Sequence, residues 1–273
     1  MTNRRGSRGG AGKNSGRGSK VAYGKNRFGK TKGGKSGAGA SILGSHVSVQ
    51  RTLTVRLKRK KGRTNSQQRW LQRQLNDPYV SEAQRRGLRS RAAFKLMELD
   101  QRFELLKRGA KVIDLGAAPG GWSQVAIDVV GETGVVVGID LSPVAPMEGV
   151  IFLEGDFLDP DAPDRLKREL GGLADVVLSD MAAATTGHAP SDHLKIVALA
   201  ETAIDFAVTV LAPGGGFVAK VLQGGTERTL LTKLRQNFAR VIHAKPESSR
   251  KESAELYVVA MGFRGVQEDE SPK

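Results

Sequence analysis

The sequence predicts an α/β protein with a mostly parallel sheet of seven strands, helices on both faces of the sheet, and a disordered basic N-terminal arm. Three observations predict this fold class. Short β-rich runs alternate with helix-like segments from residue 111 to residue 261, and a glycine-rich turn follows the first of these runs. Of the 43 Lys and Arg residues, 20 lie in residues 1–76, which contain no acidic residue.

The arm carries the charge asymmetry of the chain. The remaining 23 basic residues are outnumbered by all 28 acidic residues, so the net charge of +15 comes from the first quarter. Residues 1–44 cannot bury enough apolar surface to fold, and we expect them to be disordered. We assign residues 1–58 to the extension and residues 59–273 to a folded domain. Tyr23 and Phe28 lie among basic residues, which favours contact with nucleic acid; a merely solubilising tail is the alternative.

The composition excludes several classes of protein. Because the chain has no cysteine, it has no disulfide, no Cys-ligated zinc and no thiolate nucleophile. We expect no metal site, since the four histidines are isolated, and no membrane span, since no apolar run is long enough. The Arg- and Ser-rich start resembles a mitochondrial transit peptide, but its many glycines disfavour an amphipathic helix. We therefore expect a cytoplasmic protein.

The elements before residue 111 follow from apolar periodicity. Alternation over Val47–Leu57 predicts a strand, and residues 56–63 form a basic run. Helical spacing begins near Ser66, and a second helix is predicted over Ser90–Leu106.

Seven strands are predicted after that helix. They are Lys111–Leu115, Gly134–Asp140, Val150–Glu154, Ala174–Ser179, Gly215–Val221, Val241–Ala244 and Leu256–Met261. Helices are predicted over Ser123–Val130 and Ser191–Leu211. Because only residues 245–255 separate the last two strands, we expect these strands to pair antiparallel.

The glycine-rich turn is the first candidate binding element. Residues 112–122 read VIDLGAAPGGW, and Asp140 ends the second strand 24 residues after Gly116. Ligands of open α/β sheets bind beyond the carboxyl ends of the strands, and a carboxylate there can accept hydrogen bonds from ribose hydroxyls. The pattern indicates an adenosine-type cofactor, either NAD or S-adenosylmethionine.

The spacing of the glycines favours S-adenosylmethionine. NAD requires G-x-G-x-x-G, which seats the pyrophosphate on a helix N-terminus. Here Gly116 and Gly120 are four residues apart, and Asp114 stands beside the turn as a carboxylate partner for a cation. S-adenosylmethionine carries no phosphate, but it has a sulfonium and an amino group.

Two charged residues stand at the ends of the fourth and fifth strands. Asp180 follows one strand, and Lys220 lies within the other, where a lysine is costly unless it is paired. A strand-end salt bridge is the structural interpretation. In the functional interpretation, Asp180 holds a desolvated lysine that serves as a base or an orienting donor. The two loop histidines, His188 and His193, are interpreted as surface or capping residues.

Several segments, in order, resemble the FtsJ family of methyltransferases. The similarity runs from about Lys60 to Phe263, and only the arm lies outside it. The segments are 90–96 (SRAAFKL), 114–124, 180–182 (DMA), 220–224 (KVLQG), 245–250 (KPESSR) and 255–257 (ELY).

The resemblance implies a class I (Rossmann-like) S-adenosylmethionine-dependent methyltransferase that methylates the 2′-O of a uridine in 23S rRNA of the large ribosomal subunit or its precursor. The family's catalytic tetrad falls on Lys95, Asp180, Lys220 and Glu255. Its cofactor residues fall on Gly120, Trp122, Asp140, Asp156 and Asp180.

One departure and two alternatives remain. Ala183 and Ala184 replace the family's Pro and Asn, so nucleotide contacts of that loop are in question. A methyltransferase for tRNA or mitochondrial rRNA shares the tetrad chemistry. The second alternative, a non-catalytic assembly factor, is disfavoured by the complete tetrad. Methylation of cytosine C5 is disfavoured because it needs a cysteine.

Overall fold

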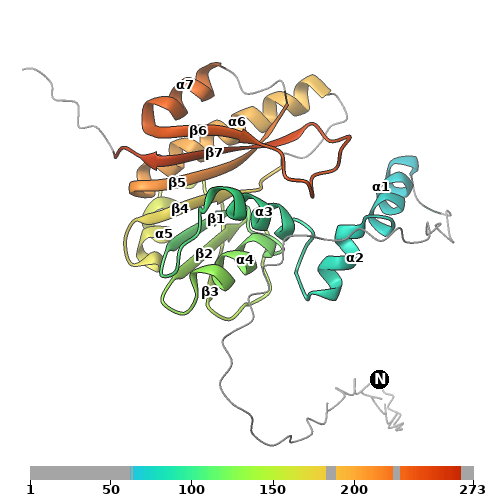
Figure 1. The fold of residues 1–273 in the computed structure, drawn as a ribbon, viewed down its shortest axis with the longest axis horizontal. Coiled ribbons are helices and arrows are strands. Elements are labelled where there is room, and N and C mark those ends of the chain that lie inside the picture. The colour runs from blue at the N-terminus through green and yellow to red at the C-terminus, as the bar shows by residue number, and fades with distance from the viewer. Residues whose placement is uncertain (1–61, 63, 183–188, 224–227, 266–273) are drawn as a thin grey trace, which may run out of the picture. The chain divides into compact units, whose positions relative to one another are not determined.

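A single sheet with helices on both faces makes up most of the structure (Figure 1). The computed structural model describes residues 62, 64–182, 189–223 and 228–265. The helices are α1 (Asn65–Leu75), α2 (Pro78–Arg85), α3 (Ala93–Phe103), α4 (Gly121–Val130), α5 (Ala162–Leu170), α6 (Ala189–Val210) and α7 (Arg228–Asn237). The strands are β1 (Lys111–Leu115), β2 (Val135–Asp140), β3 (Val150–Glu154), β4 (Ala174–Ser179), β5 (Leu211–Leu222), β6 (Phe238–Ala244) and β7 (Glu255–Phe263).

The strand order of the sheet is β3-β2-β1-β4-β5-β7-β6. The pairs from β3 to β5 are parallel, whereas β7 runs antiparallel to both β5 and β6. The predicted mostly parallel sheet of seven strands, with an antiparallel pair at the end of the chain, is confirmed. The order reverses between β1 and β4, and the loops after these two strands diverge there, which opens a crevice at the carboxyl edge of the sheet.

Apolar side chains alternate between the two faces of the sheet. Ile113 and Leu115 belong to a core cluster that includes residues of α5, α6 and α7, whereas Val112 belongs to a cluster with residues of α3 and α4. On β5 and β7, Val218 and Tyr257 belong to the cluster on the α3/α4 side. Polar residues two positions away from Val218 or Tyr257 on the same strand therefore face α3 as well.

The predicted boundaries differ most at α3 and at the starts of β5 and β6, which begin at Leu211 and Phe238 rather than at Gly215 and Val241. The helix predicted over Ser90–Leu106 begins at Ala93 and ends at Phe103. Glu104 has a φ of 51°, and the Asp100 carboxylate accepts a hydrogen bond from the Leu106 amide, which turns the chain out of the helix.

Several predictions lie outside the described residues. They are the disorder of the arm, the strand over 47–57 and the boundary at residue 58. Within the described residues, no helix has both the length and the apolar character needed to cross a bilayer.

Candidate active site

Four charged side chains from four elements meet near the carboxyl edge of the sheet. Lys95 comes from α3, Asp180 directly follows β4, Lys220 lies near the end of β5, and Glu255 begins β7. They are the residues that the sequence predicts as a catalytic tetrad. Successive members of the tetrad are 35 to 85 residues apart in the sequence. The parallel strands and the long α6 crossover bring Asp180 and Lys220 to the same edge.

The tetrad forms two short ion pairs that are linked at Asp180. Lys220 Nζ lies 2.7 Å from Asp180 Oδ1 and also donates to the Asp180 carbonyl at 2.6 Å. Lys95 Nζ lies 2.5 Å from Glu255 Oε1 and 3.8 Å from Asp180 Oδ1. All four side chains are between 7% and 19% exposed, so that their interactions are only weakly screened by water.

The two lysines determine the charge state of Glu255. Burial raises the pKa of this carboxyl, but Lys95 and Lys220 outweigh the effect of burial, and the pKa is lowered below its ordinary value. Glu255 is therefore ionised at neutral pH and pairs with Lys95 as a carboxylate.

Tyr257 lies inside the tetrad. It is fully buried, and its hydroxyl contacts Lys95 Nζ at 2.9 Å, Asp180 Oδ1 at 2.6 Å and Glu255 Oε1 at 3.0 Å. Burial raises the pKa of Tyr257 well above 10, and the Asp180 and Glu255 carboxylates raise it further, so that the hydroxyl keeps its proton. The sequence places Tyr257 in a family motif but gives it no role, because its contacts depend on the register between β5 and β7.

A cavity of about 590 Å³ lies beside the tetrad, at the carboxyl ends of β1, β2, β3 and β4. Among the residues that line it are four predicted cofactor residues, Gly116, Asp140, Asp156 and Asp180. Its apolar lining includes Ile139, Leu141, Phe157, Leu158, Met181 and Leu199. Asp180 is thus common to the cavity and the tetrad.

Asp140 shapes the entrance of the glycine-rich turn. Its Oδ2 accepts a hydrogen bond from the Ala118 amide at 2.9 Å, and its Oδ1 accepts one from the Ser142 amide at 2.8 Å. Each carboxylate oxygen has a second lone pair, so Asp140 can still accept hydrogen bonds from a ligand.

Gly120 and Trp122 hold the turn against neighbouring elements and are not among the described residues that line the cavity. A Cβ on Gly120, which has a φ of 98°, would lie 2.9 Å from the Arg89 guanidinium. The indole of Trp122 is buried and donates a hydrogen bond to the Ala92 carbonyl at 2.8 Å. Their structural contribution is to fix the turn next to the start of α3.

Asp114 lies beneath the turn, where it is 1% exposed and does not belong to the described cavity lining. Its Oδ2 accepts a hydrogen bond from the Ser123 hydroxyl at 2.6 Å. Burial raises its pKa to about 7, against the hydrogen bond from Ser123, and the Asp180 carboxylate raises it further. Its direct role as a partner of a bound cation stays a prediction.

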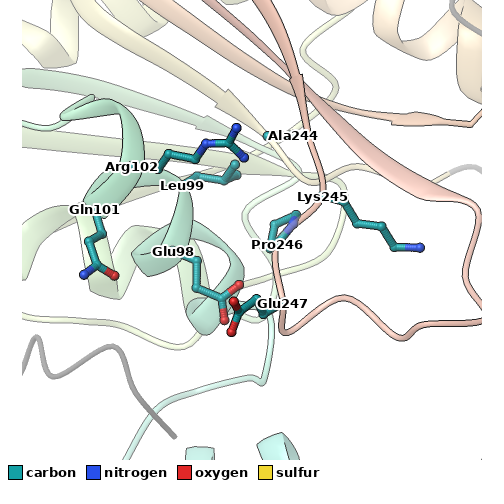
Figure 2. A pocket seen from close by; sticks show the side chains of 8 residues that line it. All are labelled: Glu98, Leu99, Gln101, Arg102, Ala244, Lys245, Pro246 and Glu247. Atoms are coloured by element: carbon teal, nitrogen blue, oxygen red, sulfur yellow. The ribbon is translucent and has the colours of Figure 1, made fainter.

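A second cavity, of about 260 Å³, lies between α3 and the segment after β6 (Figure 2). Figure 2 shows the Glu98 and Glu247 carboxylates close together there. Glu98 accepts hydrogen bonds from the Ser248 amide at 3.0 and 3.1 Å, and burial raises the pKa of Glu98. Glu98 therefore anchors the connection that leads into Glu255.

The large cavity fits S-adenosylmethionine by the chemistry of its lining. Carboxylates at the ends of β2 and β3 suit ribose hydroxyls and an adenine amino group, and the apolar residues suit the faces of the base. The acidic side chains Asp140, Asp156 and Asp180 favour a cationic ligand over a pyrophosphate. Among the described residues, no group of three or more His, Asp or Glu side chains could hold a metal ion.

Comparison with known proteins identifies the family. Residues 88–263 match the family model described as FtsJ-like methyltransferase. The chain belongs to this family. It is 62% identical over 223 residues to "Ribosomal RNA large subunit methyltransferase E" of Paramagnetospirillum magneticum, a match that covers 80% of this chain and 91% of the relative. The protein of that name from Xanthobacter autotrophicus is 60% identical over 218 residues, which are 79% of this chain and 86% of the relative.

A solved structure supports the same assignment. The crystal structure of a ribosomal RNA methyltransferase from Plasmodium falciparum is 30% identical, with a TM-score of 0.58, and the match covers 65% of this chain and all of the other. The FtsJ-like chain described here is therefore a methyltransferase. Its Ala183, Ala184 and His188 lie outside the described residues, as does the side chain of His193.

Proposed function

We propose that the protein transfers a methyl group from S-adenosylmethionine to the ribose 2′-oxygen of a uridine in 23S rRNA, within the large ribosomal subunit or its precursor. The observation that carries the proposal is the position of Asp180, which lines the donor-sized cavity and pairs with Lys220 at 2.7 Å. A ribose hydroxyl that is held by Lys220 thus lies next to the cavity that holds the donor.

The tetrad supplies alignment and removes a proton. Bound S-adenosylmethionine supplies an electrophilic methyl on a sulfonium. As the neutral amine, Lys220 Nζ orients the ribose hydroxyl and accepts its proton while the O–C bond forms and the C–S bond breaks. Asp180 holds Lys220, while Lys95, held by Glu255, contributes positive potential that anchors the nucleotide. In-line positioning of this kind is worth about 7–11 kcal/mol in favourable cases.

The cavity residues hold the donor. Asp140 accepts hydrogen bonds from the donor's ribose hydroxyls, and Asp156 meets the adenine amino group. Gly116 lets the backbone approach the donor, while Gly120, Asp114 and Trp122 support the turn from outside the cavity.

The RNA substrate is supported by charge and by the relatives. The arm has 14 basic and no acidic residues in positions 1–58, which suits RNA phosphates. The relatives at about 60% identity carry the name of a large-subunit rRNA methyltransferase. We place the protein in the cytoplasm, where bacterial large subunits mature, and its product supports late steps of that maturation.

The test is methyl transfer to RNA from cells that lack this protein. Large subunits and total tRNA would be incubated separately with the purified protein and radiolabelled S-adenosylmethionine, and the labelled nucleotide would be mapped. We expect label on one uridine ribose of 23S rRNA and none with Lys220→Ala. Label in tRNA, or on a base, would overturn the proposal.

A further inference from the structure

The hydroxyl of Tyr257 joins three of the four tetrad residues. It contacts Lys95 Nζ at 2.9 Å, Asp180 Oδ1 at 2.6 Å and Glu255 Oε1 at 3.0 Å. A phenol has one proton to donate and can accept hydrogen bonds through its oxygen. Because the lysine ammonium can only donate, the tyrosine accepts from Lys95, and its single proton is available to one of the two carboxylates.

The distances place that proton on Asp180. The contact with Asp180 is 0.4 Å shorter than the contact with Glu255. Glu255 Oε1 has other donors, namely Lys95 at 2.5 Å and the Ser249 hydroxyl at 3.2 Å. If the tyrosine donates its proton to Asp180 Oδ1, Glu255 Oε1 still receives hydrogen bonds from Lys95 and Ser249.

The backbone fixes the hydroxyl in this position. Tyr257 is directly opposite Lys220 in the antiparallel register of β5 and β7, and both side chains are on the α3 side of the sheet. The tyrosine ring packs against Trp122, with ring centroids 5.6 Å apart, and Lys95 Nζ lies 5.5 Å from its centroid. The ring thus has little freedom to rotate away from Asp180.

We propose that Tyr257 is a positioning residue, which acts by donating its proton to Asp180 Oδ1 and so weakens the hold of Asp180 on the Lys220 ammonium. The inference rests on the proposed role of Lys220 as acceptor of the hydroxyl proton. Asp180 Oδ1 accepts hydrogen bonds from the neutral Tyr257 hydroxyl and from the charged Lys220 ammonium. The tyrosine thus occupies part of the hydrogen-bonding capacity of this oxygen. Asp180 therefore holds Lys220 less strongly than an unshared carboxylate would.

Other charged groups face this cluster. They are Lys95 from α3, Glu255 from β7 and the buried Asp114 from β1, whose pKa is itself sensitive to Asp180. Removing the tyrosine oxygen also takes a hydrogen-bond partner from Lys95, at 2.9 Å, and from Glu255, at 3.0 Å. Lys95 and Glu255 keep each other as partners at 2.5 Å, so the main loss is the 2.6 Å contact with Asp180 Oδ1, the oxygen that pairs with Lys220.

The experiment compares Tyr257→Phe with the wild-type protein and with Tyr79→Phe, which removes a hydroxyl from α2. Donor binding would be measured by calorimetry, and the saturated rate kcat would be measured against pH with large subunits as substrate. For Tyr257→Phe we expect a donor affinity within about twofold of the wild type and a kcat at pH 7 reduced at least tenfold. The acid limb, which is the part of the pH profile where kcat falls as the pH is lowered, should move to higher pH by about one unit. Tyr79→Phe should match the wild type. A Tyr257→Phe acid limb at the wild-type pH would overturn the inference.

A second measurement covers the case in which Tyr257→Phe does not fold. In a Tyr23→Phe/Tyr79→Phe background, Tyr257 is the only tyrosine, and it can be replaced by 3-fluorotyrosine, a more acidic and stronger donor. The acid limb should then move to lower pH, and an unmoved limb would overturn the inference. If instead the wild-type protein binds the donor but does not methylate the subunit, the proposed function fails, independently of Tyr257.

Discussion

Asp180 combines two roles in one side chain, because it lines the donor cavity and also pairs with Lys220. Its two neighbours on the donor side, Asp140 and Asp156, have no contact with the tetrad that the structure records. Binding of the donor and transfer of the methyl group should therefore be separable by substitution.

Lys220→Ala should abolish methyl transfer and leave donor affinity within about tenfold, because Lys220 contacts Asp180 and does not line the cavity. Calorimetry with S-adenosylmethionine and a radiolabel transfer assay measure the two properties. Lys167→Ala, which removes a half-buried lysine of α5 that pairs with Asp164 at 2.9 Å, serves as control. Retained turnover in Lys220→Ala would remove this lysine from the mechanism.

Asp140→Ala should weaken donor binding at least tenfold, since the ribose hydroxyls lose their acceptor and the Ala118 amide loses its partner. Calorimetry measures the dissociation constant, and transfer at saturating donor should be less affected. An unchanged dissociation constant would show that the cavity at the end of β2 does not hold the donor.

Asp114 should make stability depend on pH. Its folded pKa of about 7 is above the value near 3.9 in an unfolded chain, so between these values the folded protein retains a proton that the unfolded chain has lost. The free energy of unfolding should therefore fall by up to about 4 kcal/mol as the pH rises from 4 to 7. In Asp114→Asn this contribution is absent. Urea denaturation at pH 4.5 and 7.5 tests it, and parallel pH dependence in both proteins would contradict it.

At the scale of elements, the segment between β6 and β7 is held by residues far away in sequence. Asp77 caps α2 through the Tyr79 amide, and its other oxygen pairs with Arg91 and Arg250, each at 3.0 Å. Arg91 also donates to the Ser248 carbonyl. One buried carboxylate thus joins α2, the start of α3 and the segment that leads into Glu255.

Asp77→Ala should lower the free energy of unfolding by about 3 kcal/mol, because it uncaps α2 and leaves two arginines without their shared carboxylate. Hydrogen exchange should rise in residues 78–85 and 246–253. Asp161→Ala is the matched control, since Asp161 occupies the N-cap of α5 without a side-chain capping hydrogen bond. Equal exchange in the two variants would show that Asp77 does not hold the segment.

Elements with a strong local pattern were predictable from the sequence. The strands β1 to β4 are short apolar runs bounded by turn residues, and each was predicted to within one residue. The tetrad followed from a family resemblance, and its pairing from opposite charges. Two sets of contacts could not be predicted. Tyr257 contacts Asp180 across 77 positions of the sequence, and Asp77 contacts Arg250 across 173, so that in each case the proximity depends on how the strands pair.

At the scale of the whole molecule, charge divides the chain: residues 1–76 carry 20 basic and no acidic residues, whereas residues 77–273 have an acidic excess. Deleting residues 1–58 should weaken binding to large subunits and flatten its salt dependence, because fewer phosphate contacts release fewer counterions. The methylated nucleotide and the saturated rate should not change, since the tetrad lies within residues 95–255. Binding measured against salt concentration, with the product nucleotide mapped in parallel, checks this. Equal salt slopes would show that the arm does not touch RNA.

The position of β7 between β5 and β6 has a consequence for biosynthesis. The last strand to leave the ribosome occupies an inner place in the sheet and carries both Glu255 and Tyr257. A nascent chain that ends at β6 already contains the described residues that line the cavity, but it lacks Glu255 and Tyr257, two partners of Lys95. The residues of the cavity are therefore synthesised before the tetrad is complete, and we expect an unfinished chain to be inactive toward the ribosome that is making it.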